Sequence, residues 1–190
     1  MFAKSKVSGR EILFSIILGA AAAIISLFIL WNSIQSVGDN KSLVPVSQNV
    51  EPVTFYATQH GAFKTQESAQ SFQKQHVSLN KSMLYFDGQT YYIWSKLHVT
   101  KTTEVTTPAS FSKAITLQSN SCTVKEIANI PQLLQEEKAL NNSFEGKTVP
   151  TDWQQQVETI SAVTTDVSEI RLMLLQHYLQ KESCLVVQFN

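Results

Sequence analysis

The sequence is poor in the residues that build nucleotide and metal sites. It holds 6 glycines and 2 cysteines among 190 residues, and no Gly-rich phosphate loop, G-x-S-x-G motif or C-x-x-C pair occurs. The 4 histidines have neither H-x-x-x-H nor H-E-x-x-H spacing. We therefore expect no bound phosphate cofactor, no metal and no other cofactor.

Candidate catalytic groups are also few. Glu136 and Glu137 are adjacent carboxylates, but neighbouring acids on an expected helix are more typical of a solvated face than of an acid–base pair. Cys122 and His98 could form a thiol–imidazole dyad, yet a cysteine in an apolar strand is more typical of inert packing. We predict that the protein is not an enzyme.

A cluster of one charge sign is missing from most of the chain. The totals are 15 basic and 15 acidic residues. Lys4, Lys6 and Arg10 all precede residue 11, and no basic run follows them. Binding of nucleic acid needs clustered Lys and Arg, so nucleic acid is not expected as a partner.

Charge is wholly absent from residues 12–31, which are almost all apolar. As a helix this segment spans about 30 Å, the thickness of the hydrocarbon core of a bilayer. The basic residues before it place residues 1–11 in the cytoplasm and the rest outside, by the positive-inside rule. A cleaved signal peptide is the alternative, but the segment is long for one and ends in bulky residues. We predict a single-pass protein of the cell membrane.

The region after the predicted span divides into three parts. Residues 32–52 are polar, with Gly, Pro and Ser, and indicate a linker. Residues 53–129 alternate between strand and helix signals and form the predicted domain, and residues 130–190 form a predicted helical C-terminal region.

Patterns within residues 53–129 predict strands at 53–58, 82–86, 89–95 and 122–127. His60-Gly61 indicates a turn after the first strand, Thr65 an N-cap for a helix over 66–75, and Asp87-Gly88 a hairpin turn. A second helix is expected over 108–115. The order β-α-β-β-α-β predicts an α+β, ferredoxin-like fold, with both helices on one face of an antiparallel sheet and the other face free for a ligand.

The C-terminal region reads as helices over 130–144 and 152–181, then a short terminal strand over 184–189. Apolar residues recur along 152–181 at spacings of three and four. This stripe has to be buried, either on the sheet domain or on a second chain. The second option predicts a homo-oligomer, or a complex with other membrane proteins, formed through this helix.

One stretch resembles a known family. Tyr56 to Phe63, followed by Glu67-Ser68-Ala69, resembles the opening of SPOR domains, in which a strand of the form Y-x-V-Q-x-G-x-F leads into a helix with E-x-A. The hairpin ending in Tyr92-Ile93-Trp94 is similar to the family's second and third strands. Two features depart from that pattern: Ser95 stands where the family usually has glycine, and residues 99–107 are longer and Thr-rich.

The resemblance implies a ferredoxin-like domain that binds peptidoglycan, notably glycan strands without stem peptides. The whole layout is similar to membrane-anchored sporulation proteins with a SPOR-like domain, which implies a role in sporulation or division. Stacking on aromatic rings and hydrogen bonds from an amide suit a sugar, so the candidate ligand-binding residues are Gln59, Tyr85, Tyr92 and Trp94.

Two questions stay open at this point. An extracytoplasmic location permits a disulfide between Cys122 and Cys184, and two separate buried thiols are the alternative. The outer domain either binds cell-wall glycan or acts as a non-catalytic scaffold that assembles with other membrane proteins.

Overall fold

The structure, a computed structural model, describes residues 50–104, 106–141 and 148–190. The predicted tail 1–11 and membrane span 12–31 lie outside these residues, as does most of the predicted linker 32–52. Within the described ranges, no helix combines the length and the apolar character needed to cross a bilayer.

Five strands form one antiparallel sheet in the order β2-β3-β1-β4-β5. The strands are β1 (Val53–Phe63), β2 (Met83–Phe86), β3 (Tyr91–His98), β4 (Phe111–Ser119) and β5 (Leu185–Phe189). The helical elements are α2 (Gln66–Gln75), η1 (Val77–Leu79), α3 (Lys125–Ala128), α4 (Ile130–Gln135), η2 (Glu137–Leu140), α5 (Trp153–Ser161) and α6 (Val167–Lys181).

The sheet is strongly curled, as ring contacts between its two edges show. In a flat sheet β2 and β5 would lie about 19 Å apart, because neighbouring strands are spaced by about 4.8 Å. Instead the ring centroids of Tyr85 on β2 and Phe189 on β5 are 6.0 Å apart. The curl gives the sheet a concave face, on which these side chains meet.

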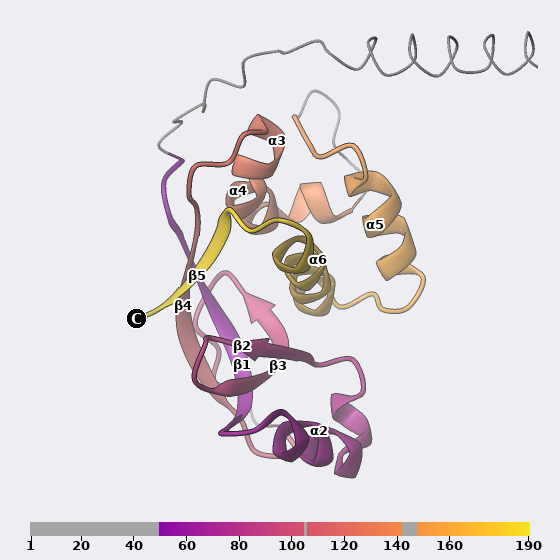
Figure 1. Cartoon of the computed structure of the whole chain (residues 1–190). Coiled ribbons are helices and arrows are strands. Elements are labelled where there is room, and N and C mark those ends of the chain that lie inside the picture. The colour runs from indigo at the N-terminus through magenta and orange to yellow at the C-terminus, as the bar shows by residue number, and fades with distance from the viewer. Residues whose placement is uncertain (1–49, 105, 142–147) are drawn as a thin grey trace, which may run out of the picture. The chain divides into compact units, whose positions relative to one another are not determined.

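Helices cover both faces of this sheet (Figure 1). Trp94 belongs to the large core that includes residues of α3–α6, whereas its neighbour Ile93 packs with Ala69 of α2. Successive residues of a strand point to opposite faces, so α2 lies on the face opposite α3–α6. The expectation of two helices on one face and a free second face is wrong.

Several local predictions are confirmed. Thr65 caps α2, since its Oγ1 accepts a hydrogen bond from the Ser68 backbone N–H at 3.2 Å. β2 and β3 form the expected hairpin, in which Gly88 has φ 99°, a conformation that glycine adopts readily. The terminal strand is β5.

The predicted ferredoxin-like β-α-β-β-α-β order is wrong at two elements. The segment expected as the second helix contains the start of β4, and the segment expected as the fourth strand, 122–127, leads into α3 instead. Ile115 and Leu117 alternate with half-exposed residues, and all of β4 up to Leu117 pairs with β1. Pairing with β1 outweighs the weak helical signal of this Ser- and Ala-containing segment.

The turn predicted at His60-Gly61 is also wrong, because β1 continues through it to Phe63. The ladder with β3 shifts register around Gln59 and Gly61, so the signal marks a β-bulge. A Cβ on Gly61 would lie 2.6 Å from the Phe63 ring, which explains why a glycine fits here.

The helix predicted over 152–181 is two helices, α5 and α6, and the one predicted over 130–144 divides into α4 and η2. Asp166 begins α6 by accepting a hydrogen bond from the Ser168 backbone N–H at 2.9 Å. The apolar positions of α5 and α6 are buried in the core of this same chain: Trp153, Val157, Ile160, Ile170 and Leu174. These positions are therefore covered within the domain, whereas Val163 is 54% exposed, and association with a second chain stays a prediction.

Two polar side chains hold the helical layer together. Asp152, at the start of α5, accepts hydrogen bonds from Tyr178 (2.8 Å), Lys181 (2.8 Å) and His177 (3.2 Å) of α6. Arg171 is 5% exposed and donates to the backbone carbonyl of Leu134 at 2.6 Å and to a carbonyl of β3 at 2.8 Å. Arg171 thus connects α6 to the end of α4 and to the sheet.

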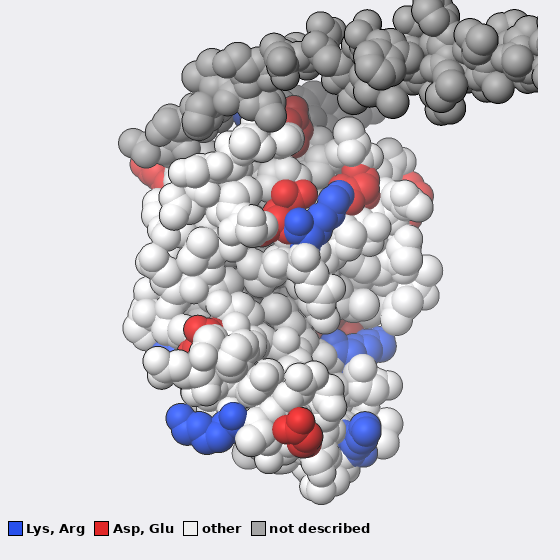
Figure 2. All heavy atoms as spheres, viewed as in Figure 1, with Lys and Arg blue, Asp and Glu red and all other residues white. Residues whose placement is uncertain are grey.

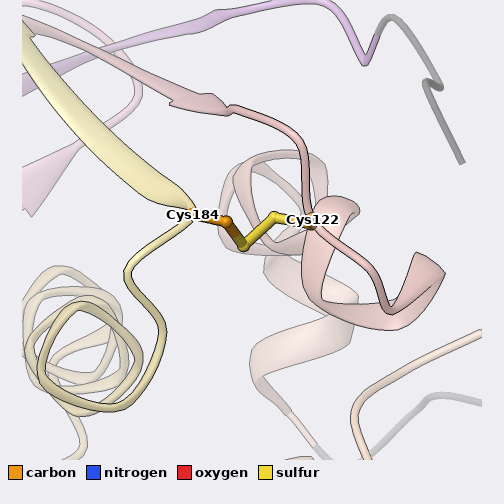
Figure 3. The surroundings of a disulfide bond; sticks show 2 residues. All are labelled: Cys122 and Cys184. Carbon is orange, nitrogen blue, oxygen red and sulfur yellow. A yellow bond between two sulfur atoms is a disulfide. The ribbon is translucent and has the colours of Figure 1, made fainter. Parts of the chain in front are cut away.

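A disulfide joins Cys122, which precedes α3, to Cys184, which precedes β5 (Figure 3). Of the two arrangements that the sequence left open, the structure has the bonded one. The link closes a loop with a sequence separation of 62, which contains α3–α6. It fixes both ends of the helical layer beside the β4–β5 edge of the sheet.

Candidate functional site

The four predicted ligand-binding residues gather in one cluster on the concave face. The rings of Tyr85 and Trp94 stack with centroids 4.8 Å apart, and Tyr92 lies 6.4 Å from Trp94. The Trp94 indole N–H donates to Gln59 Oε1 at 3.3 Å. Phe189 of β5, which the sequence did not single out, contacts all three rings.

Burial divides this cluster into two parts. Trp94 is 0% exposed and Gln59 is 4% exposed, so the amide of Gln59 serves the indole inside the core. Tyr85 and Tyr92 are partly exposed. The Tyr92 hydroxyl donates to Asp87 at 2.9 Å, at the hairpin turn. Only the two tyrosines therefore present surface to a ligand, and the binding role of the four residues stays a prediction.

The connection from β3 to β4, residues 99–110, is a second feature of interest. β3 and β4 both pair with β1, one on each side, so this connection crosses over β1. His60 of β1 holds it in place: its Nδ1 lies 3.1 Å from the Pro108 carbonyl oxygen, and its Nε2 lies 2.8 Å from Ser95 Oγ.

The geometry fixes the tautomer of His60. A carbonyl can only accept, so Nδ1 carries the proton, and Nε2 of the neutral ring accepts from the Ser95 hydroxyl. Burial lowers the pKa of His60, and the hydrogen bond to Pro108 offsets only part of this effect. Because the pKa lies below its ordinary value, the ring is neutral at pH 7. These two hydrogen bonds of His60 attach the connection, through Pro108, to β1 and β3 of the sheet.

Further side chains hold the same connection. Lys96 donates to Glu104 at 3.1 Å and also pairs with Asp166 at 3.1 Å. The Ser78 hydroxyl donates to the Thr107 carbonyl at 3.0 Å, and the Thr106 hydroxyl lies 2.7 Å from Ser110 Oγ. Residues 104, 106, 107 and 110 of this connection are therefore held by hydrogen bonds or ion pairs without any ligand.

A groove of about 400 Å³ lies between this connection and the start of β4. Hydroxyl groups dominate its lining, together with one aromatic ring and one charge of each sign: Lys101, Thr102, Thr103, Glu104, Thr106, Ala109, Ser110, Phe111 and Ser112. Phe111 is 55% exposed. The sequence carried a signal for this groove in its Thr-rich stretch, but its shape depends on the crossing over β1.

The nucleophile pair that the sequence offered is not assembled. Cys122 is in the disulfide, and His98 lies 3.2 Å from the Thr58 hydroxyl, so the candidate Cys122–His98 dyad is not formed. The Ser95–His60 pair lines no part of the groove. Residues 50–104, 106–141 and 148–190 hold no group of three or more His, Cys, Asp or Glu placed to bind a metal.

Comparisons with known proteins add no identification: no family model, no curated protein and no solved structure matches the chain. The resemblance to SPOR domains therefore stays a prediction from the residues of β1 and α2. The described topology shares the first strand, first helix and hairpin with that expectation and departs from it after β3.

Proposed function

We propose that the protein is a non-catalytic, extracytoplasmic cell-envelope protein that is held at the cell membrane and binds peptidoglycan glycan, with a role in sporulation or division. The disulfide between Cys122 and Cys184 is the observation that best supports the extracytoplasmic location, because such bonds persist in oxidising compartments outside the cytoplasm. The uncharged apolar residues 12–31, preceded by basic residues, support attachment to the membrane.

Glycan as the ligand is supported by the resemblance of Tyr56 to Ala69 to SPOR domains and by the surface chemistry. The face shown in Figure 2 carries few charged side chains, and both signs are mixed on it. Such a face offers no continuous basic patch of the kind that nucleic acid needs, and a polymer of sugar rings with scattered carboxylates does not need one.

Pull-down with purified sacculi tests the proposal. The full chain in mild detergent is incubated with intact sacculi and with sacculi whose stem peptides an amidase has removed. We expect the protein to sediment with the sacculi, and more of it after amidase treatment. Equal recovery with and without sacculi, in both preparations, would reject glycan binding.

A further inference from the structure

The geometry points to the groove lined by residues 101–104, 106 and 109–112, rather than the aromatic cluster around Trp94, as the place where a glycan strand binds. This inference rests on the proposed function and adds to it the position of the site and the role of each group. Its first support is access. Phe111 is 55% exposed at the groove, whereas the indole of Trp94 is wholly buried and Tyr85 and Tyr92 beside it are only partly exposed.

The groove offers the two kinds of contact that a sugar ring uses. The exposed ring of Phe111 can stack against the apolar face of a pyranose. Residues with hydroxyl groups line the same groove, and a hydroxyl can both donate to and accept from sugar hydroxyls. Among the described lining residues, only Phe111 and Ala109 have apolar side chains.

Some of these hydroxyls have no partner inside the protein. The exposed Thr103 hydroxyl makes no hydrogen bond to the described part of the chain, and the buried Ser112 Oγ also has none. Thr103 is exposed, so its hydroxyl can both donate to and accept from a ligand, whereas Ser112 Oγ is enclosed by the protein. Thr106 and Ser110 differ, because their hydroxyls bond to each other and shape the groove.

The charged side chains at the groove give a reason for it to bind peptidoglycan strands without stem peptides more tightly than strands that carry them. Glu104 already pairs with Lys96 at 3.1 Å, which leaves the exposed Lys101 as a cation without a partner in the described residues. Removing the stem peptides from peptidoglycan frees a carboxylate on each lactyl group. Lys101 would attract this carboxylate, so the groove would prefer stripped strands to strands that carry peptides.

Matched variants test the position of the site in the sacculus assay. Phe111→Ala should weaken binding to amidase-treated sacculi about tenfold, the loss expected for one stacked ring. Phe86→Ala is the control, since Phe86 is 48% exposed and lies on β2, outside the groove lining. It should bind like the wild type. Lys101→Met should remove the preference for treated over untreated sacculi, with little effect on untreated ones.

The possible outcomes test the position of the binding site and the binding of glycan separately. Wild-type binding that survives Phe111→Ala and Lys101→Met unchanged would overturn the assignment of the groove and leave glycan binding in place. Absence of wild-type binding would reject the function as well. Unfolding midpoints of the variants equal to that of the wild type show that any loss comes from the surface, as expected for exposed positions. Thr103→Val, which keeps the shape and removes the unpaired hydroxyl, gives a second independent reading.

Discussion

The disulfide offers the sharpest test of how the domain is held together. Replacing Cys122 and Cys184 by alanine in one variant opens a loop with a sequence separation of 62. In the chain-entropy account, the cross-link lowers the entropy of the unfolded chain by an amount that grows with the logarithm of loop length. For this loop the expected loss in the free energy of unfolding is about 4 kcal/mol. Domains of this size have about 5–15 kcal/mol in total, so the loss is a large fraction.

Urea denaturation followed by tryptophan fluorescence measures this loss. Wild type in a reducing agent should lose the same free energy as the double variant, and the reducing agent should leave the double variant unchanged. A loss below about 1 kcal/mol, or a reduced wild type as stable as the oxidised one, would refute the reasoning. It would also weaken the argument for an oxidising compartment.

Three further changes probe the core, the buried cation and the acid network. Trp94→Ala should cost about 4 kcal/mol of unfolding free energy, because the 0%-exposed indole leaves a cavity. Arg171→Met should cost about 3 kcal/mol, because the buried carbonyls of Leu97 and Leu134 lose their donor. Although burial alone would raise the pKa of Asp152, hydrogen bonds from α6 lower it to about 2. Its stabilising contribution is therefore complete above about pH 5 and lost as pH falls towards 2, and Asp152→Asn should flatten this part of the pH profile of stability.

Each of these predictions has a result that contradicts it. A Trp94→Ala variant as stable as the wild type would place the indole outside the core. An Arg171→Met variant of unchanged stability would mean that water or another donor satisfies the two carbonyls. A pH profile between 5 and 2 that Asp152→Asn leaves unaltered would show that other carboxylates dominate acid unfolding. Urea denaturation measures the stability change in all three cases, as a shift of the midpoint while the dependence of the unfolding free energy on urea concentration stays constant.

Local signals predicted the elements whose ends are fixed by their own residues. Thr65 caps α2 and Gly88 turns the hairpin, and both act within a few residues of where they stand. β4 could not be predicted in this way, because its residues become a strand by pairing with β1, between 52 and 64 positions earlier. The break between α5 and α6 did have a local signal, since Asp166 followed by Glu169 is the pattern of a helix start within the long apolar stripe.

In the candidate site, too, some features follow from local residues and others from contacts between distant parts of the chain. Sequence reasoning chose Gln59, Tyr85, Tyr92 and Trp94, and these residues do lie together. Which of them reach solvent depends on the curl of the sheet and on Phe189 from the far edge, neither of which a residue pattern reveals. Gln59 in particular accepts a hydrogen bond from the Trp94 indole, and this contact follows from the register of β1 and β3, which the sequence does not reveal.

Hydrogen exchange on the full chain, with and without soluble glycan fragments released from amidase-treated sacculi, tests the central claim most directly. The account predicts that the fragments slow exchange in peptides covering residues 99–112 and leave residues 83–94 unchanged. Slowed exchange confined to residues 83–94, or no change anywhere in the described domain at saturating fragment, would contradict it.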